Sequence, residues 1–282
     1  MAFKRSGVRA PSAPHPSRCK SGFFYFFNGG SFLMSVCIVI PARLQSHRLP
    51  RKMLAEIHGK PLLRYIYEAV SKVKSVDAVY IATDSEDIQT VANNFGARVF
   101  LTDPKLPSGT ARIASIVNQL EYPFIVNVQG DNPLTDPKVV EAVIAELVKD
   151  KADVVTPVWP IRQTADLTDP AVVKVARASD GRAVYFSRSP VPFLRDYPIG
   201  EWLKKEKYWG HYGIYGYRRS LLEAIAADRL PESRIEQMEK LEQLRFLEAG
   251  LTIQTIETDS REISVDTPED LEYVRKLIGK MN

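Results

Sequence analysis

Short apolar segments alternate with helical patterns along the first half of this chain, and this alternation constrains the fold more than any other feature. The apolar segments are rich in β-branched and aromatic residues and occupy residues 36–40, 78–82, 97–101 and 124–128. Between them, Pro61 suits a first helical position, and Asp84 or Ser85 can cap a second helix that Gly96 ends. We therefore expect a Rossmann-like α/β fold, with a mostly parallel sheet and helices on both faces. Ligands of such sheets bind at the carboxyl ends of the strands.

The second half of the chain follows a different pattern. Residues 172–178 and 182–186 alternate in polarity around an Asp-Gly pair, which indicates a β-hairpin. Residues 211–217 are typical of a further strand. We expect a single domain over residues 34–282, with an inserted lobe for substrate binding and dimerisation around residues 157–218.

Two helices are expected near the C-terminus. One has apolar residues at helical spacing, at positions 235, 238, 241 and 244, and ends at Gly250. The other opens at Thr267, where the sequence Thr-Pro-Glu-Asp is a capping signal.

The net charge of the chain is concentrated at its N-terminal end. The formal charge at pH 7 is +4, and residues 1–33 contribute +5 without any acid, which leaves the rest of the chain at −1. A nucleic-acid-binding domain carries its excess positive charge on the folded part, so we expect no nucleic-acid partner.

The first residues do not fit the predicted sheet. Residues 1–33 are rich in Ser, Pro, Arg and Phe and precede a second methionine, Met34. We expect a disordered or mis-assigned extension; an organelle transit peptide fits the composition, whereas a secretory signal fits poorly. Polar and glycine residues interrupt the apolar stretch 22–42, so we expect no stable membrane insertion. Two cysteines, Cys19 and Cys37, cannot form a disulfide framework, which indicates a reducing compartment. The expected location is therefore the cytoplasm, unless the extension directs import into an organelle.

A basic loop follows the first strand, over residues 41–52. It carries four cations together with a small polar residue, in the order Arg43, Ser46, Arg48, Arg51 and Lys52. A guanidinium group can bind two phosphate oxygens at once, and a lysine adds a compact positive charge. The loop could therefore hold a triphosphate. Because the loop has no glycine, it is neither a P-loop nor a dinucleotide-binding fingerprint. The alternative is an ordinary solvated basic loop.

Two aspartates stand at positions suited to a metal ion. Asp131 follows the fourth strand, and Asp266 precedes the last helix. Mg²⁺ binds through one or two carboxylates and keeps several waters, so this pair could hold it. Alternatively, Asp131 is a turn residue and Asp266 a helix cap.

Three further groups of residues could contact a ligand. Ser108, Gly109 and Arg112 lie at the start of a helix, where backbone amides can bind an anion or the edge of a base. The spacing of His211 and Tyr215 places both on one face of a strand, where they could line a pocket or belong to the core. Glu242 and Gln243 could hydrogen-bond a polyol or be ordinary helix-surface residues.

Taken together and in order, these segments resemble the 3-deoxy-manno-octulosonate cytidylyltransferases, or CMP-Kdo synthetases. The resemblance runs from about Val36 to the C-terminus. Its motifs are residues 40–43 with 48–52, Ser-Gly-Thr with an arginine at 108–112, residues 126–131, 185–188, 213–217, 241–245 and 265–270.

The resemblance implies a reaction and a set of roles. The anomeric hydroxyl of a 3-deoxy-2-ulosonic acid attacks the α-phosphate of CTP, in a Mg²⁺-dependent enzyme that is a homodimer. The nucleotide would contact Ala42, Arg43, Ser46, Lys52, Ser108, Gly109, Arg112 and Gln129. The sugar acid would contact Arg48, Gln129, His211, Tyr215, Glu242 and Gln243. Magnesium would be held by Asp131 and Asp266, and the implied catalytic residues are Arg43, Arg48, Lys52 and Asp131.

The chain departs from the family pattern at several positions. Ala111 stands where an acid is usual, Leu106 where His is common, and Asn132 where Glu usually follows the aspartate. His47 stands before Arg48 where the family often has Thr, and Arg51 stands before Lys52 where it often has Gly. These changes leave open which sugar is used: Kdo, an amino-substituted Kdo, or a nonulosonate. A non-catalytic nucleotide-binding relative is the third alternative, although retention of both carboxylates and the basic loop argues against it.

Overall fold

The computed structural model describes residues 34–46 and 48–281, which belong to one structural unit. The expectations for residues 1–33 and the departure at position 47 lie outside these residues. Its strands are β1 (Val36–Ala42), β2 (Glu56–Ile57), β3 (Lys60–Pro61), β4 (Ala78–Thr83), β5 (Arg98–Leu101), β6 (Phe124–Val128), β7 (Val154–Pro160), β8 (Lys174–Arg177), β9 (Ala183–Ser187), β10 (Trp209–His211), β11 (Ile214–Arg218) and β12 (Ile253–Glu257). Its α-helices are α1 (Leu62–Val70), α2 (Glu86–Asn94), α3 (Gly109–Ser115), α4 (Pro137–Leu147), α5 (Thr164–Thr168), α6 (Trp202–Lys205), α7 (Arg219–Ala226), α8 (Arg234–Glu239), α9 (Gln243–Glu248) and α10 (Pro268–Met281). Short 3-10 helices include η2 (Lys52–Leu54), η3 (Val117–Gln119) and η4 (Ile199–Glu201).

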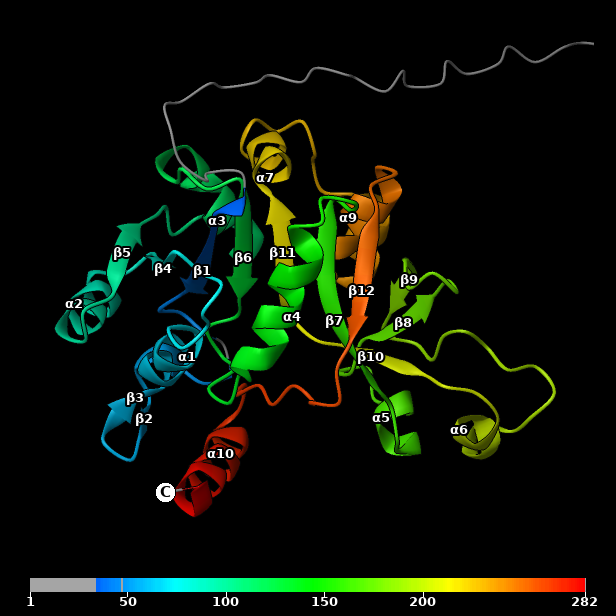
Figure 1. The fold of residues 1–282 in the computed structure, drawn as a ribbon. Coiled ribbons are helices and arrows are strands. Elements are labelled where there is room, and N and C mark those ends of the chain that lie inside the picture. Colours follow the sequence, from blue (N-terminus) through cyan, green and yellow to red (C-terminus); the bar gives the residue numbers. More distant parts are fainter. Residues whose placement is uncertain (1–33, 47, 282) are drawn as a thin grey trace, which may run out of the picture. The chain divides into compact units, whose positions relative to one another are not determined.

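A central sheet organises the unit (Figure 1). Its first half has the order β5-β4-β1-β6, and all neighbouring strands in this half are parallel. The four strands correspond to the four apolar segments of the sequence, and the Rossmann-like expectation is confirmed. Because β1 lies between β4 and β6, their carboxyl ends meet at one edge, the lower edge in Figure 1.

The second half of the sheet is mixed. β11 lies antiparallel between β6 and β7, and β12 pairs in parallel with β7. β10, β8 and β9 continue the sheet with antiparallel pairing. The predicted hairpin is present as β8 and β9, and Gly181 in its turn has φ 84°, which glycine adopts without strain.

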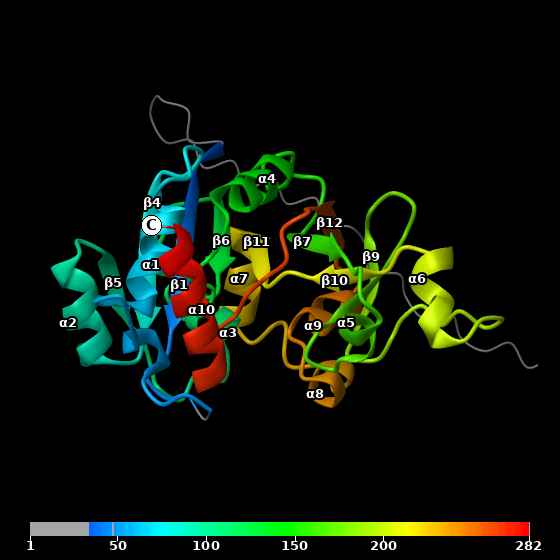
Figure 2. The ribbon, with the colours of Figure 1, turned by 90° about the horizontal axis from the view of Figure 1, so that it is seen from below.

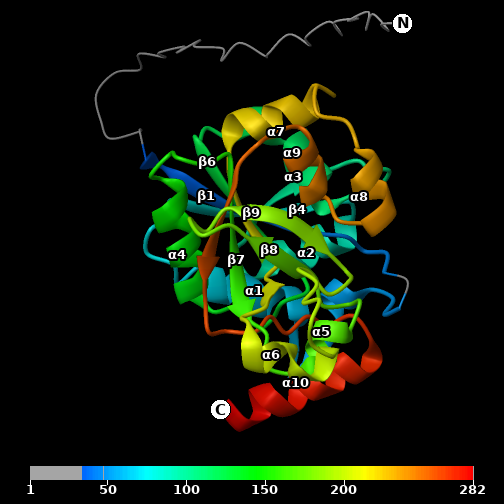
Figure 3. The ribbon, with the colours of Figure 1, turned by 90° about the vertical axis from the view of Figure 1, so that its right-hand side faces the viewer.

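Helices cover both faces of the sheet (Figures 1 and 2). Alternate side chains of β1 point to opposite faces, so Val36, Ile38 and Ile40 pack with α1, α4 and α10, while Cys37 and Val39 pack with α3, α7 and α9. Burial raises the pKa of the Cys37 thiol to about 12. Seen from the side of β8 and β9, α5, α6 and α10 lie at the same end of the sheet (Figure 3). Among the described residues, no helix has the length and apolar character needed to span a membrane.

The helix signals at Ser85 and Thr267 are confirmed. Ser85 Oγ accepts a hydrogen bond from the Ile88 amide at 3.4 Å. Thr267 Oγ1 accepts one from the Asp270 amide at 3.2 Å, while the Asp270 carboxylate accepts one from the Thr267 amide at 2.9 Å. Each cap satisfies amides that the first turn of a helix leaves free.

The single strand expected over residues 211–217 is wrong. The structure has two strands, β10 and β11, separated at Tyr212 and Gly213. The Ile214 amide turns back to the Tyr212 carbonyl at 2.8 Å, and the Gly213 amide donates to a side-chain carboxylate instead of a strand. These two bonds take the Gly213 and Ile214 amides out of the ladder, while the Tyr212 amide still donates to the Pro157 carbonyl of β7 at 3.0 Å.

The single helix expected over residues 235–244 is also wrong. Lys240 adopts a left-handed conformation with φ 54°, which ends α8, and α9 begins at Gln243. Met238 is 73% exposed, whereas Leu241 and Leu244 are buried. The apolar residues that occur at helical spacing therefore do not lie on one helix, because the chain forms two helices here.

Candidate active site

Three of the predicted segments converge at the carboxyl edge of the sheet. A Cβ on Gly130 would lie 2.8 Å from the Pro41 carbonyl oxygen, so only glycine allows β6 to end this close to β1. A Cβ on Gly109 would lie 3.2 Å from the Pro41 ring and 3.6 Å from Gln129 Oε1. The end of β1, the end of β6 and the start of α3 are thus in contact.

Lys52 lies between the two predicted metal carboxylates. Its Nζ is 2.9 Å from a carboxylate oxygen of Asp131 and 2.9 Å from one of Asp266, and its side chain is only 7% exposed. Burial alone would lower the pKa of Lys52, but the two carboxylates outweigh it and raise the pKa above its usual value. Lys52 therefore stays charged and holds the two carboxylates together.

The backbone also joins the two aspartates. The Val265 amide donates to the Asp131 carbonyl at 2.9 Å. Arg48, which is 65% exposed, makes an ion pair of 3.1 Å with Asp266. The sequence placed these residues in separate segments, and the fold brings them to one point.

The donor set fits a magnesium ion. Both carboxylates reach Lys52 Nζ, so a metal ion bound beside it would be held by hard oxygen ligands of Asp131 and Asp266. No group of three or more potential metal ligands exists among the described residues. Two carboxylates completed by water and substrate phosphates are the arrangement Mg²⁺ favours over an all-protein site. The roles of Asp131 and Asp266 as metal ligands stay predictions.

The basic loop is held by Asp84, a residue that the sequence analysis considered only as a helix cap. Asp84, which follows β4, accepts a hydrogen bond from the Leu44 amide at 3.0 Å and from the Arg112 guanidinium at 3.2 Å. Arg112 is fully buried and also donates to Thr102 Oγ1. In this structure Arg112 thus supports the loop through Asp84, and its contact with a nucleotide stays a prediction. Asp84 could have been found, because it too follows a parallel strand.

Arg43 lies on the solvent side of the same loop. It is exposed and one guanidinium nitrogen contacts the Pro107 carbonyl at 3.4 Å, next to Ser108. The Ser108 hydroxyl caps α3 through the Ala111 amide at 3.1 Å. Ala42 is buried and Ser46 half-buried in the same loop region. The side chains of Arg43 and Arg48 are both exposed to solvent, where an anionic ligand can reach them.

Aromatic and amide side chains of β10, β11 and α9 form a second group, called here the aromatic wall. The rings of His211 and Tyr215 lie 5.2 Å apart, and Tyr215 stacks on Tyr217 at 5.7 Å. The Tyr215 hydroxyl donates to Gln243 Oε1 at 3.0 Å. Gln243 Nε2 and Glu242 Oε2 are buried and find no partner within the described part of the chain. Buried polar atoms left unpaired are unfavourable unless a ligand or water satisfies them.

His211 is enclosed despite lying at the start of this wall. Its Nε2 is 2.9 Å from Thr156 Oγ1, and Phe186 packs edge-on against its ring at 5.3 Å. Burial lowers the pKa of His211 to about 3. The imidazole is therefore neutral at physiological pH and suited to hydrogen bonding with a hydroxyl.

The lowered pKa of His211 predicts how stability depends on pH. The unfolded chain takes up a proton near pH 6.5 and the folded chain only near pH 3, so His211 favours folding above pH 6.5 and this contribution is lost as the pH falls. Between pH 7.5 and 5.0 we expect this residue to cost about 2 kcal/mol of stability. His211→Gln keeps a partner for Thr156 and removes the titration. Urea unfolding at both pH values should show wild type losing about 2 kcal/mol more than the variant; equal losses would contradict the assignment.

Glu262 is a residue that the sequence analysis missed. It lies between β12 and α10, and its carboxylate accepts hydrogen bonds from the Gly213 amide at 2.9 Å and from the Asn132 side chain. Burial raises the pKa of Glu262 to about 7; Asp131 and Asp266 add to the rise, while the bonds from Gly213 and Asn132 oppose it. No motif marked it, because its partners come from distant segments.

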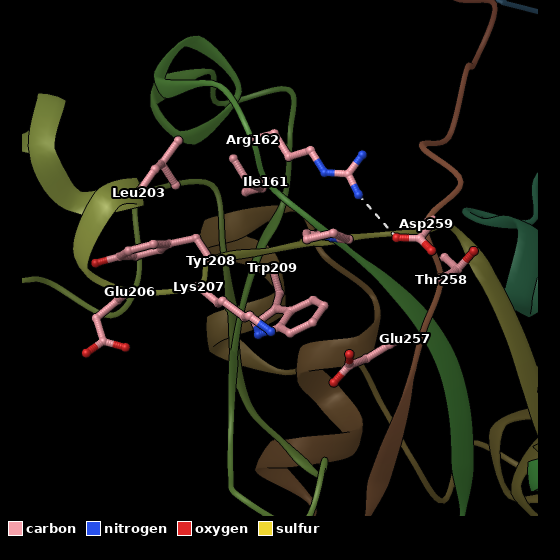
Figure 4. Close-up of a pocket in the computed structure, with 11 residues that line it drawn as sticks. Ile161, Arg162, Leu203, Glu206, Lys207, Tyr208, Trp209, Glu257, Thr258 and Asp259 are labelled. Carbon is pink, nitrogen blue, oxygen red and sulfur yellow. Dashed lines mark hydrogen bonds and ion pairs between the residues drawn. The ribbon is translucent and has the colours of Figure 1, made fainter.

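A separate pocket lies outside this constellation (Figure 4). It has a volume of about 450 Å³ and contains none of the predicted site residues. Arg162 and Asp259 form an ion pair of 3.1 Å at its rim, and Trp209 lies at its base.

Comparison with known proteins gives consistent results. A cytidylyltransferase family model matches residues 37–254. The chain is 42% identical to a 3-deoxy-manno-octulosonate cytidylyltransferase of Chlorobaculum parvum, over 86% of this chain and 97% of the relative. It is 41% identical to an 8-amino-3,8-dideoxy-manno-octulosonate cytidylyltransferase of Shewanella sp. ANA-3, over 84% of this chain and 96% of the relative. A solved CMP:2-keto-3-deoxy-manno-octonic acid synthetase complexed with CTP superposes with a TM-score of 0.82, at 38% identity, over 88% of this chain and all of that one.

Proposed function

The chain belongs to the cytidylyltransferase family and, within it, to the 3-deoxy-manno-octulosonate cytidylyltransferases, and from this premise we propose that it joins CMP from CTP to 3-deoxy-D-manno-octulosonate (Kdo). The observation that carries the proposal is the placement of Lys52 between Asp131 and Asp266. The exposed cations Arg43 and Arg48 and the unpaired atoms of Glu242 and Gln243 support it. The products are CMP-Kdo and pyrophosphate, and the activated sugar serves lipopolysaccharide-type polysaccharide synthesis.

The reaction is a nucleotidyl transfer. The anomeric hydroxyl oxygen of Kdo attacks the α-phosphorus of CTP, the bond from that phosphorus to the β-phosphate oxygen breaks, and the hydroxyl proton passes to water. Such transfers depend on positioning and charge neutralisation more than on covalent catalysis. Arg43 and Lys52 supply positive charge to the triphosphate, and Gln129, Ser108 and Gly109 border the nucleotide. Asp131 and Asp266 would hold Mg²⁺, which would neutralise further phosphate charge.

The sugar acid is proposed to lie against the aromatic wall. The unpaired atoms Glu242 Oε2 and Gln243 Nε2 offer one acceptor and one donor, which suits a polyol. His211 and Tyr215 border the same space. Arg48 is exposed and binds the sugar carboxylate, which would otherwise be repelled by the triphosphate.

Pyrophosphate release tests the proposal directly. The full chain and a form that starts at Met34 are given CTP, Mg²⁺ and Kdo, with UTP and ATP as nucleotide controls. We expect release that requires both CTP and Kdo. Release with a nonulosonate but not with Kdo would mean that the substrate is a nonulosonate. CTP binding without turnover of any sugar would favour a non-catalytic relative.

The amino-substituted sugar is the second candidate. The chain is about as similar to the 8-amino-3,8-dideoxy-manno-octulosonate enzymes as to the Kdo enzymes, at 41% against 42% identity. The ratio of kcat/KM for the two sugars decides between them. We expect the ratio to favour Kdo.

We also propose a homodimer located in the cytoplasm. Apolar side chains are exposed around β9 and the segment before α6, including Val184 at 60% and Phe193 at 75%. Exposed apolar groups in one region favour association with a second copy. Sedimentation equilibrium should give twice the 31.8 kDa chain mass; a monomer mass would rule the dimer out.

A further inference from the structure

We propose that Glu262 is a positioning residue, whose carboxylate holds the turn between His211 and Tyr215 against the segments that carry Asp131 and Asp266. The inference rests on the proposed function and extends it to a residue outside the motifs of the resemblance. It is carried by the hydrogen bonds of Glu262 and by the three segments that these bonds connect.

The carboxylate joins parts of the chain that are far apart in sequence. Oε2 accepts the Gly213 amide at 2.9 Å, from the connection between β10 and β11. Oε1 accepts the side-chain amide of Asn132, the residue after Asp131. Glu262 itself precedes Asp266 by four residues, on the segment that crosses below the sheet from β12 to α10 (Figure 1).

The contact with Gly213 is close enough to define the turn. A Cβ at position 213 would lie 2.9 Å from Glu262 Oε1, so the carboxylate fills the space that a side chain would occupy. The Gly213 amide, which lies between β10 and β11, gives its hydrogen bond to this carboxylate. Gly213 is the midpoint of the segment between His211 and Tyr215, whose rings lie 5.2 Å apart.

The contact with Asn132 ties Glu262 to the segment that carries Asp131. Asn132 is buried, and its Oδ1 finds no partner among the described residues. The hydrogen bond from the Asn132 side-chain amide to Glu262 therefore orients this side chain.

Removal of the side chain tests the role. Glu262→Ala leaves the Gly213 amide and the Asn132 amide unpaired, so the aromatic wall and Asp131 lose their common support. We expect KM for Kdo to rise about 10-fold and kcat to fall about 10-fold, the size of effect of a lost charge-assisted bond at each contact. Binding of CTP in the absence of Mg²⁺, measured by calorimetry, should stay within about 3-fold, because Glu262 is bonded to Gly213 and Asn132 and not to the cations of the basic loop.

The amide variant separates positioning from a direct role of the charge. In Glu262→Gln, the new Oε1 can accept the Gly213 amide. The new Nε2 can donate to Asn132 Oδ1 once the Asn132 side-chain amide turns over, because its Nδ2 faces Glu262 in this structure while Oδ1 has no partner among the described residues. We expect kcat/KM within about 5-fold of wild type. An effect as large as that of Glu262→Ala would mean that the charge acts directly, and would overturn the positioning role.

A matched control lies at the opposite edge of the sheet. Asp153 is half-buried and accepts the Thr252 amide at 2.8 Å, before β7 begins. Asp153→Ala loses a comparable bond, so it should lower thermal stability while leaving KM for Kdo unchanged. A similar rise of KM in this control would show that Glu262→Ala acts through general loss of structure, and the proposal would fall.

Hydrogen exchange gives a readout that does not depend on catalysis. Exchange at the Gly213 amide should be at least about 10-fold faster in Glu262→Ala and near the wild-type rate in Glu262→Gln. Unchanged exchange in Glu262→Ala would overturn the proposal. If wild type releases no pyrophosphate with any sugar, the proposed function fails, and the exchange rates still decide whether Glu262 holds the turn.

Discussion

Asp131→Asn should lower turnover by at least about 10³-fold, which corresponds to about 4 kcal/mol in the barrier, while the protein stays folded. An amide is neutral and a poor ligand for Mg²⁺, so one of the two carboxylates that converge at Lys52 is lost. The fold survives because Lys52 keeps its ion pair with Asp266, and the loss of one partner costs about 1–2 kcal/mol. Initial rates of pyrophosphate release, together with circular dichroism, measure both effects.

An exposed aspartate gives the control for this variant. Asp259 is 94% exposed and pairs with Arg162 at the rim of the separate pocket. Asp259→Asn makes the same chemical change and should leave turnover within about 2-fold, because exposed ion pairs contribute little. Near-full activity of Asp131→Asn would show that this carboxylate has no role in the reaction.

Lys52→Met should have the second largest effect. It removes the one cation that bridges Asp131 and Asp266 and leaves two carboxylates facing each other across a half-buried space. We expect the free energy of unfolding to fall by about 2 kcal/mol, and turnover to fall at least about 10²-fold because the triphosphate loses a positive partner.

Added Mg²⁺ makes this variant a test of the metal site. With the ammonium gone, the paired carboxylates are free to bind a divalent cation, so Mg²⁺ should raise the melting temperature of Lys52→Met more than that of wild type. Lys174 is the matched control, since it is a buried lysine whose Nζ donates to the backbone carbonyls of Asp169 and Val172. Lys174→Met should lose stability that Mg²⁺ does not restore. Equal responses to Mg²⁺ in both variants would contradict a metal site between Asp131 and Asp266.

Much of the fold could be predicted because its signals are local. The β-branched segment at Val36–Ala42 and its three parallel partners depend on residue type within a few positions. The caps at Ser85 and Thr267 likewise depend on side chains that bond within their own turn. The predictions that failed involve longer interactions: β10 and β11 separate because Glu262 takes the Gly213 amide, and apolar spacing could not show that Lys240 ends α8.

The residues of the site divide in the same way. Asp131 and the basic loop were accessible to sequence reasoning because each follows a strand, and a parallel sheet brings strand ends to one edge. Asp84 also follows a parallel strand, but it was considered only as a helix cap. Glu262 met none, because 49 positions separate it from Gly213 and 130 from Asn132.

The sequence by itself determined the parallel α/β half of the sheet, the position of the basic loop at its carboxyl edge, and the family through motifs that occur in a fixed order. Only the tertiary structure decided that Lys52 is shared by Asp131 and Asp266, that Arg112 is buried against Asp84, and that Glu262 closes the turn at Gly213. The physical reason is the range of the interactions. Strand and helix preferences arise within a few residues of chain, whereas ion pairs and buried hydrogen bonds form between whichever groups the folded sheet brings within about 3 Å of each other.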